Sequence, residues 1–199
     1  QKIADSMDII LSKTIVGFSK YANKINPDLI VIHGDRVETL ACATVGSLNN
    51  FRTAHIEGGE VSGTVDEILR HSISKLCHIH LVTNLKARTR LIQMGELKEN
   101  IYVIGSPDID ILLSKTLLSL EKVKKRYNFN FEKYAVAIFH PVTTDLMKTK
   151  KNCRIFLNSI KESAMNYILI YPNNDAGSDK IIKEYEKIKN TNIKLLPSM

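Results

Sequence analysis

Short apolar runs alternate with longer amphipathic stretches along most of the chain, and this alternation constrains the fold more than any other feature. The amphipathic stretches repeat their apolar residues at helical spacing, whereas the short runs are rich in β-branched residues, as buried strands are. A regular strand–helix alternation indicates right-handed βαβ units, which place their strands in a parallel sheet. The expected strands, in chain order, are Leu29–His33, Thr53–Ile56, Ile79–Thr83, Ile101–Ile104, Tyr134–Phe139, Tyr167–Tyr171 and Ile193–Leu196.

The alternation is interrupted once, and the interruption divides the expected architecture into two α/β domains. Residues 1–109 and 133–199 each resemble a Rossmann-like strand–helix series, and a lysine-rich helical linker over 110–132 joins them. The chain opens inside a helical pattern and stops just after a strand, so we expect both domains to be incomplete portions of a longer protein. The expected helices are Ile3–Ile25, Thr39–Asn49, Asp66–Leu76, Lys86–Met94, Asp110–Tyr127, Asn152–Met165 and Asp179–Lys189.

Composition places the chain among ordinary soluble globular proteins, with 44% hydrophobic and 25% charged residues. We recognise neither a membrane-spanning run nor a signal peptide, and expect a cytoplasmic protein with no membrane partner. The three cysteines lack the spacing of a metal site, so we expect reduced thiols and no metal. The net charge is +7, but the lysines lie mainly along expected helix faces and no nucleic-acid-binding motif accompanies them. Nucleic acid is therefore not an expected partner.

Charged residues directly follow the first expected strand, at the position where open α/β sheets bind ligands. Asp35 can accept a proton or orient a group, and Arg36 can bind a phosphate through two hydrogen bonds. A neighbouring Asp–Arg pair is also common as a surface ion pair or at a helix N-cap. On these two residues alone, the structural interpretation is favoured.

The second expected strand ends in a more informative segment, HIEGGEVSGTVDEILRH, over His55–His71. Glu57 leaves the strand and is followed by two glycines, which let a backbone approach a ligand closely. Glu60 and Ser62 continue this loop. Because the carboxyl ends of parallel strands meet at one edge of a sheet, we expect these carboxylates to converge with Asp35. Such a cluster favours proton-transfer chemistry on an anionic substrate.

The helix that follows carries further ionisable groups in its first turns. Thr64 and Glu67 match a capping box, which gives Glu67 the structural role of holding the helix N-terminus. Asp66 and Arg70 are four residues apart and share a helix face, with His71 beside them. A surface ion pair between Asp66 and Arg70 would explain them without function. The adjacent glycine-rich loop favours function, because helix N-termini bind anions.

The second domain repeats the placement of polar residues at strand ends. His140 directly follows the expected strand Tyr134–Phe139, where a histidine can protonate or stabilise a leaving phosphate. The loop Pro172–Ser178 follows the next strand and precedes a helix. It could hold a diphosphate or a uridine, although a simple turn explains these residue types equally well.

These segments, in this order and spacing, resemble the hydrolysing UDP-N-acetylglucosamine 2-epimerases. The matching motifs are HGDR, HIEGGEVSGTVDEILRH, IGSP, FHPVTTD and YPNNDAGS. The combination of GGEVSGTVDE with HPVTTD separates the hydrolysing branch from the non-hydrolysing epimerases. The resemblance covers essentially the whole chain and is nearest to bacterial enzymes of sialic acid and capsule synthesis.

The resemblance implies two Rossmann-like domains in a glycosyltransferase-B arrangement with a UDP-sugar between them, and neither a metal nor another cofactor. It implies elimination of UDP to give 2-acetamidoglucal, followed by addition of water to give N-acetylmannosamine. Members of this family form homodimers or homotetramers, so a homo-oligomer is expected. The catalytic residues that it implies are Asp35, Glu57, Asp66, Arg70 and His140. The substrate-binding residues that it implies are Arg36, Glu60, Ser62, His71 and Asn173.

The chain also departs from the family pattern, and three alternative functions stay open. The family's first strand with its Gly-Thr/Ser-Arg loop and its later Gly-Asn-Ser-Ser turn are absent, so we do not expect activity from these 199 residues alone. The first alternative is a hydrolysing 2-epimerase of UDP-N,N'-diacetylbacillosamine, on the legionaminic acid route. The second is a retaining UDP-sugar glycosyltransferase, which the carboxylate cluster disfavours. The third is a non-catalytic nucleotide-binding module, in which Glu57→Gln would leave function intact.

Overall fold

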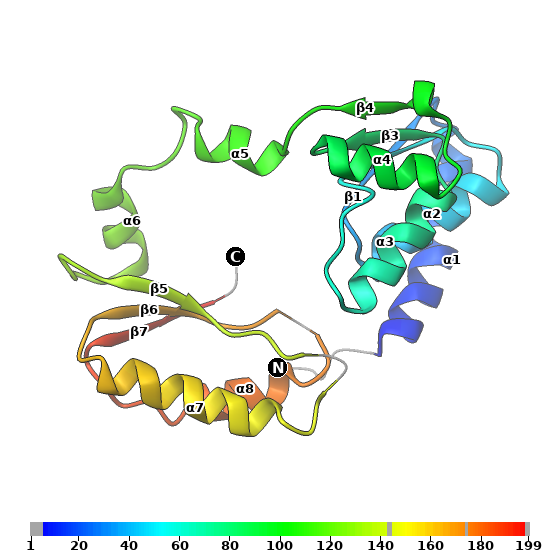
Figure 1. Ribbon diagram of the computed structural model, residues 1–199. Helices are drawn as coiled ribbons and strands as arrows, with labels where there is room; N and C mark the ends of the chain where they lie inside the picture. The colour runs from blue at the N-terminus through cyan, green and yellow to red at the C-terminus, as the bar shows by residue number, and fades with distance from the viewer. Residues whose placement is uncertain (1–5, 143–144, 174, 198–199) are drawn as a thin grey trace. The chain divides into compact units, whose positions relative to one another are not determined.

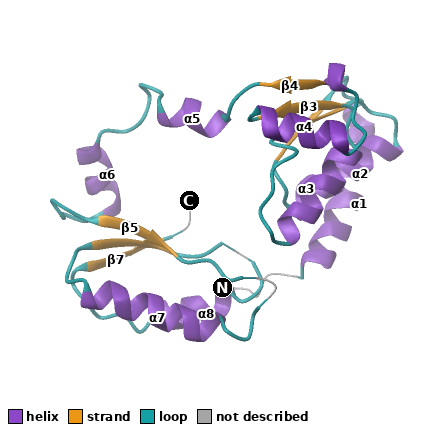
Figure 2. Cartoon of the chain, viewed as in Figure 1, coloured by secondary structure: helices purple, strands orange, loops and turns teal. Residues whose placement is uncertain are grey.

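The computed structural model describes residues 6–142, 145–173 and 175–197. The chain divides into two compact units, Gln1–Lys115 and Thr116–Met199, called unit 1 and unit 2 below. Their boundary falls within the range 110–132, where the sequence predicts a linker. Each unit is built on its own parallel sheet (Figures 1 and 2).

Unit 1 contains a four-stranded parallel sheet with the strand order β1-β2-β3-β4. In the middle of the sheet, His55 of β2 lies beside Ile32 of β1 and His80 of β3. Helices α1, α2 and α3 pack next to one another, while α4 lies against β3 and β4 (Figure 1). The elements of unit 1 are α1 (Met7–Ile25), β1 (Ile30–His33), α2 (Val37–Leu48), β2 (Thr53–Ile56), α3 (Val65–Lys75), β3 (Ile79–Val82), α4 (Leu85–Gln93), η1 (Lys98–Asn100), β4 (Ile101–Val103) and α5 (Pro107–Leu112).

The small residues of α2 let this helix approach the sheet closely. Ala41 and Ala43 are fully buried. A Cβ atom at Gly46 would lie only 2.3 Å from Cγ2 of Thr53 in β2, so a larger residue would push the helix away from the strand. The core beside it contains Ile30 and Ile32 of β1 and Ile73 of α3.

Unit 2 contains a three-stranded parallel sheet with the order β5-β6-β7. Helices α7 and α8 pack against each other (Figure 1). Leu157, Ile181 and Tyr185 from these helices form a core with Leu169 of β6. The elements of unit 2 are α6 (Leu120–Tyr127), β5 (Ala135–Ile138), α7 (Thr149–Glu162), β6 (Tyr167–Ile170), α8 (Ser178–Tyr185) and β7 (Ile193–Leu196).

The seven expected strands are confirmed to within one residue at each end, but the helix expected over Asp110–Tyr127 is wrong. It is two helices, α5 and α6, because each has its own start signal. Pro107 begins α5 after Ser106, and the Ser119 hydroxyl accepts the Lys122 backbone N–H at 3.4 Å to cap α6. The segment between them is rich in serine and threonine, which favour caps over helix interiors. Of the helix expected from Ile3, residues 3–5 lie outside the described residues.

No helix in the described part of the chain combines the length and the apolar character needed to cross a membrane.

Two histidines are buried side by side in the sheet of unit 1. His55 is completely inaccessible and His80 is 1% exposed. Burial lowers the pKa of His55 to about 4, despite the opposing hydrogen bond to the Gly34 carbonyl. Burial also lowers the pKa of His80, against the opposing effect of Glu96. Both imidazoles are therefore neutral in the folded protein near neutral pH.

Because the unfolded chain binds protons at these histidines near pH 6.5 and the folded chain does not, unit 1 loses stability as pH falls from about 6.5 toward 4. The His55 contribution is about 3 kcal/mol at its fullest. Urea titration followed by amide exchange in β2 measures it. Between pH 7 and 4, we expect His55→Gln to lose less stability than the wild type. We expect the control His140→Gln to lose as much stability as the wild type. Equal losses in the wild type and His55→Gln would contradict this.

Candidate active site

An ion pair between Asp35 and Arg70 lies at the carboxyl end of the sheet of unit 1. Asp35 follows β1, whereas Arg70 projects from α3, and the guanidinium donates to Asp35 Oδ2. The Arg70 side chain is only 10% exposed. It also donates to the Glu60 carbonyl at 3.0 Å and contacts the Ser62 hydroxyl at 3.5 Å. Arg70 therefore connects the end of β1 to the loop that follows β2.

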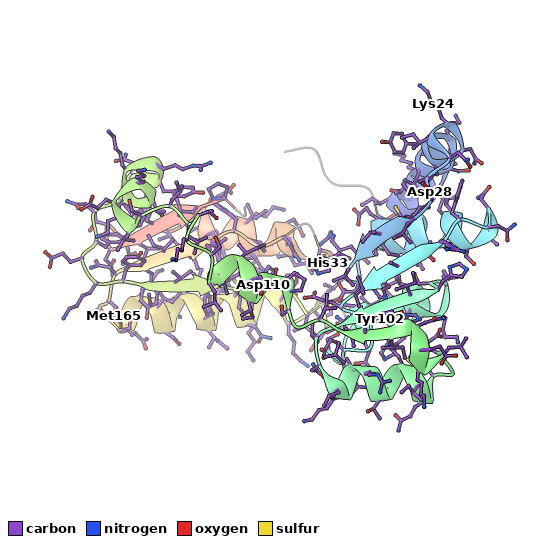
Figure 3. All side chains as sticks on the ribbon, turned by 90° about the horizontal axis from the view of Figure 1, so that it is seen from above. Lys24, Asp28, His33, Tyr102, Asp110 and Met165 are labelled. Atoms are coloured by element: carbon purple, nitrogen blue, oxygen red, sulfur yellow. The ribbon has the colours of Figure 1, made fainter. Side chains whose placement is uncertain are left out.

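Glu57 is the first residue after β2, and its backbone is in the left-handed conformation with φ of 67°. This conformation is rare for a residue with a side chain, and such strain is concentrated at functional sites. The carboxylate is fixed on both sides. Its Oε2 lies 2.8 Å from Nε2 of His33, and its Oε1 accepts from the Ser106 hydroxyl at 3.4 Å. His33 ends β1, as Figure 3 shows with Asp28 at the other end of the strand.

The two glycines after Glu57 are required because their backbone touches other elements. A Cβ atom at Gly58 would lie 2.7 Å from the Ser74 hydroxyl and 2.9 Å from Nδ1 of His55. Gly59 has φ of 80°, and a Cβ atom there would lie 2.5 Å from the Ala87 carbonyl. These glycines therefore let the loop approach α3 and α4 closely.

Two other carboxylates of this segment are occupied within the protein. Glu60 Oε1 accepts from the hydroxyl of Thr83 and from the Asn84 side-chain amide at 2.7 Å. Glu67 Oε2 accepts the backbone N–H groups of Ser62 and Gly63 at 2.8 and 2.9 Å. These backbone hydrogen bonds lower the pKa of Glu67. Glu60 and Glu67 therefore hold the loop in shape.

The capping box expected from Thr64 and Glu67 is wrong. Thr64 is the N-cap of α3, but its hydroxyl donates to Oδ2 of Asp66 at 3.0 Å instead of capping the backbone. Glu67 reaches past Thr64 to the two preceding amides, because Gly63 turns the chain with φ of 67°. The structural role predicted for Glu67 is retained by a different set of hydrogen bonds.

The two simple ion pairs considered from sequence are also not formed. Among the described residues no ion pair joins Asp66 to Arg70, since Arg70 pairs with Asp35. Arg36 pairs not with its neighbour Asp35 but with Glu38, at 3.5 Å, and its side chain is 56% exposed. His71 follows Arg70 on α3, and its Nδ1 is buried without a hydrogen-bond partner among the described residues.

Unit 2 places its two candidates at the carboxyl ends of adjacent parallel strands. His140 is exposed after β5, and Asn173 follows β6. The Asn173 side chain donates to Oδ2 of Asp175 at 2.6 Å and accepts the Asp175 backbone N–H at 3.3 Å, which shapes this loop. Within the two motifs of unit 2, residues 143, 144 and 174 lie outside the described residues.

Sequence reasoning missed several residues that contact the candidates or the backbone beside them. They are His33, His55, Thr83, Asn84 and Ser106. Each lies in a strand or at the end of one, so the strand-end rule applied to β1, β3 and β4 would have found all but the buried His55. Over the described residues, no three His, Cys, Asp or Glu side chains are grouped so that they could hold a metal ion.

The chain is similar to known 2-epimerases both in sequence and in fold. The family model described as UDP-N-acetylglucosamine 2-epimerase matches residues 1–199. A UDP-N-acetylglucosamine 2-epimerase of Neisseria meningitidis serogroup B is 47% identical over 195 residues, 98% of this chain and 52% of its own. A UDP-N,N'-diacetylbacillosamine 2-epimerase (hydrolyzing) of Legionella pneumophila is 33% identical over 184 residues, 90% of this chain and 49% of its own.

A solved structure shares the fold. It is a UDP-GlcNAc 2-epimerase from Neisseria meningitidis bound to UDP-GlcNAc, with a TM-score of 0.78 and 17% identity, covering 100% of this chain and 57% of its own. The predicted α/β class with parallel sheets is confirmed. The chain spans about half the length of the relatives that it matches. With a family model matched over its whole length and a relative 47% identical to it, the chain belongs to the UDP-N-acetylglucosamine 2-epimerase family.

Proposed function

We propose that the protein is a hydrolysing UDP-N-acetylglucosamine 2-epimerase, which converts UDP-N-acetylglucosamine and water into N-acetylmannosamine and UDP for sialic acid synthesis in the cytoplasm. The observation that carries the proposal is the 47% identity to the Neisseria epimerase over 98% of this chain. The motifs GGEVSGTVDE and HPVTTD favour the hydrolysing branch.

The proposed reaction has two stages. In the first, a carboxylate removes the proton at C2 of the sugar, the C1–C2 double bond forms, and the C1–O bond to UDP breaks. In the second, water adds across the double bond of 2-acetamidoglucal, with hydroxide at C1 and a proton returned to C2 on the opposite face. Neither stage involves net oxidation or reduction, so the proposal includes no redox cofactor.

Removal of the C2 proton is difficult because this proton is not acidic, so the base must be held in a reactive geometry. The fixed carboxylates of unit 1 suit this need. Glu57 is held between His33 and Ser106, and Asp35 is held by Arg70. We assign Asp35, Glu57 and Asp66 to proton transfer and Arg70 to orienting Asp35.

The remaining candidates fit roles in binding UDP and the sugar. Arg36 is more than half exposed and has a long contact with Glu38, which leaves its guanidinium able to bind a diphosphate. His140 is exposed and can serve the departing UDP as a proton donor. We assign Asn173 to UDP and His71 to substrate binding. Glu60 and Ser62 act through the shape of their loop, since both contact other parts of unit 1.

The second candidate substrate is UDP-N,N'-diacetylbacillosamine. The Legionella relative at 33% identity favours it, although less than the Neisseria relative favours UDP-N-acetylglucosamine. Both candidates use the same elimination, so unit 1 would act in the same way on either sugar. Parallel turnover measurements with the two UDP-sugars on the full-length protein separate them.

We expect the full-length protein, incubated with UDP-N-acetylglucosamine in heavy water, to release UDP and free N-acetylmannosamine that carries deuterium at C2. The label enters because the proton returned to C2 comes from solvent. Mass spectrometry and NMR identify the products. Retention of the original C2 hydrogen would exclude the elimination route. UDP-N-acetylmannosamine as the product would show a non-hydrolysing enzyme.

Asp35→Asn and Glu57→Gln should each lower kcat by about 10²–10⁴-fold, the usual contribution of a general acid or base. UDP should still bind, because these changes leave the proposed diphosphate contacts in place. Steady-state turnover and calorimetric titration with UDP measure the two effects. Glu99→Gln, an exposed carboxylate of η1, is the matched control and should keep wild-type turnover. Wild-type kcat in Glu57→Gln would remove this residue from the chemistry.

Arg36→Ala should weaken UDP binding by roughly 10- to 100-fold, the loss expected for charge-assisted hydrogen bonds. The control is Arg52→Ala, because Arg52 is exposed at the amino end of the same sheet. Isothermal titration with UDP compares both variants with the wild type. An unchanged affinity in Arg36→Ala, or an equal loss in Arg52→Ala, would contradict the assignment.

A further inference from the structure

His55 is the most deeply buried ionisable residue beside the candidate site, and the proposed reaction gives it no role. It lies in β2, between β1 and β3, and its exposed fraction is zero. Burying an imidazole is unfavourable unless its nitrogens are hydrogen-bonded. Both nitrogens of His55 have partners. One partner directly precedes Asp35 in the sequence, and the other is one helical turn after Arg70.

One partner directly follows β1, and the other lies on α3. Nε2 lies 2.9 Å from the carbonyl oxygen of Gly34, the residue before Asp35. Nδ1 lies 3.0 Å from the hydroxyl oxygen of Ser74, and that oxygen lies 3.0 Å from the carbonyl oxygen of Arg70. His55 thus contacts the backbone directly before Asp35 and, through Ser74, the turn of α3 that follows Arg70.

The hydrogen-bond partners determine which nitrogen carries the proton. A carbonyl oxygen only accepts, so Nε2 of His55 must donate to Gly34. The ring is neutral near pH 7, because burial lowers the pKa of His55 to about 4. Nδ1 is then an acceptor, and the Ser74 hydroxyl donates to it. The single Ser74 proton is therefore drawn to His55 and away from the Arg70 carbonyl.

The surroundings of the ring leave it little freedom to move. Gly58, in the loop after Glu57, is so close that a Cβ atom would lie 2.9 Å from Nδ1 of His55. The ring consequently supports the ends of β1 and β2 and the middle of α3 at once. A shift of the ring would move the backbone of Gly34 and α3 relative to each other, and with them the two charged groups.

We propose that His55, as the neutral tautomer with the proton on Nε2, is a positioning residue that sets the geometry of the Asp35–Arg70 pair. The proposal rests on the proposed function, in which Asp35 transfers a proton. His55 itself contacts no substrate and acts through Gly34 on one side and Ser74 on the other. Misplacement of a reacting group by about 1 Å costs on the order of 100-fold in rate, so this support affects kcat.

The chain contains a matched control in His80. It lies beside His55 on the next strand, is 1% exposed, and contacts Glu96 at 3.1 Å instead of the candidate site. In the full-length protein, we expect His55→Leu to lower kcat by about 100-fold with a small change in KM, whereas His80→Leu keeps kcat within about 3-fold. His55→Gln, whose amide can still donate to Gly34, should recover much of the loss.

Similar kcat losses in His55→Leu and His80→Leu would show a general packing effect and overturn the proposal, as would full kcat in His55→Leu. If His55→Leu fails to fold, Ser74→Ala, which removes the Nδ1 partner, replaces it in the kcat comparison. If His80→Leu fails to fold, His80→Gln takes its place as the control. Nitrogen NMR of the imidazole tests the tautomer without turnover. A proton on Nδ1 would overturn the proposal even in an active enzyme. The function alone would be refuted by a different set of results. In that case the wild type would be inactive on both UDP-sugars, His55 would still have the expected tautomer, and the Arg70 Nε–H resonance would still move in Ser74→Ala.

Discussion

The nearly buried guanidinium of Arg70 is the constraint on which the candidate site depends. A charge with so little exposure is unfavourable unless a counter-charge and further acceptors surround it. Asp35 supplies the counter-charge, and the Glu60 carbonyl and the Ser62 hydroxyl supply the acceptors. These groups come from the end of β1 and from the loop after β2, and Arg70 itself projects from α3. The need to satisfy one side chain therefore fixes the relative positions of all three.

The acidic residues of unit 1 divide into two groups by what surrounds them. Glu60 and Glu67 are used within the protein, one by Thr83 and Asn84 and the other by two backbone amides. Glu57 instead faces the imidazole of His33, whose Nε2 lies 2.8 Å from its carboxylate. A loop shaped by its own carboxylates can hold Glu57 in a strained left-handed conformation without a bound ion. In the proposed reaction this rigidity is what makes Glu57 effective.

The sequence alone predicts the sheet well and the site only in part, for a physical reason. Strands and helices follow from local periodicity, so all seven strands were found. Pairs such as His33 with Glu57 or Asp35 with Arg70 join residues 24 and 35 positions apart, and only the register of the sheet brings them together. Local rules also mislead when tertiary contacts compete with them. Glu67 fits a capping box by spacing, yet it binds the amides that Gly63 turns toward it.

The proposed elimination needs two events at neighbouring sugar atoms, loss of the C2 proton and departure of UDP from C1. The carboxylates suited to the first belong to unit 1, and the histidine suited to the second belongs to unit 2. Each unit is held together by its own core. The strand-end loops of the two units therefore carry different chemistry, with carboxylates after β1 and β2 in unit 1 and a histidine after β5 in unit 2.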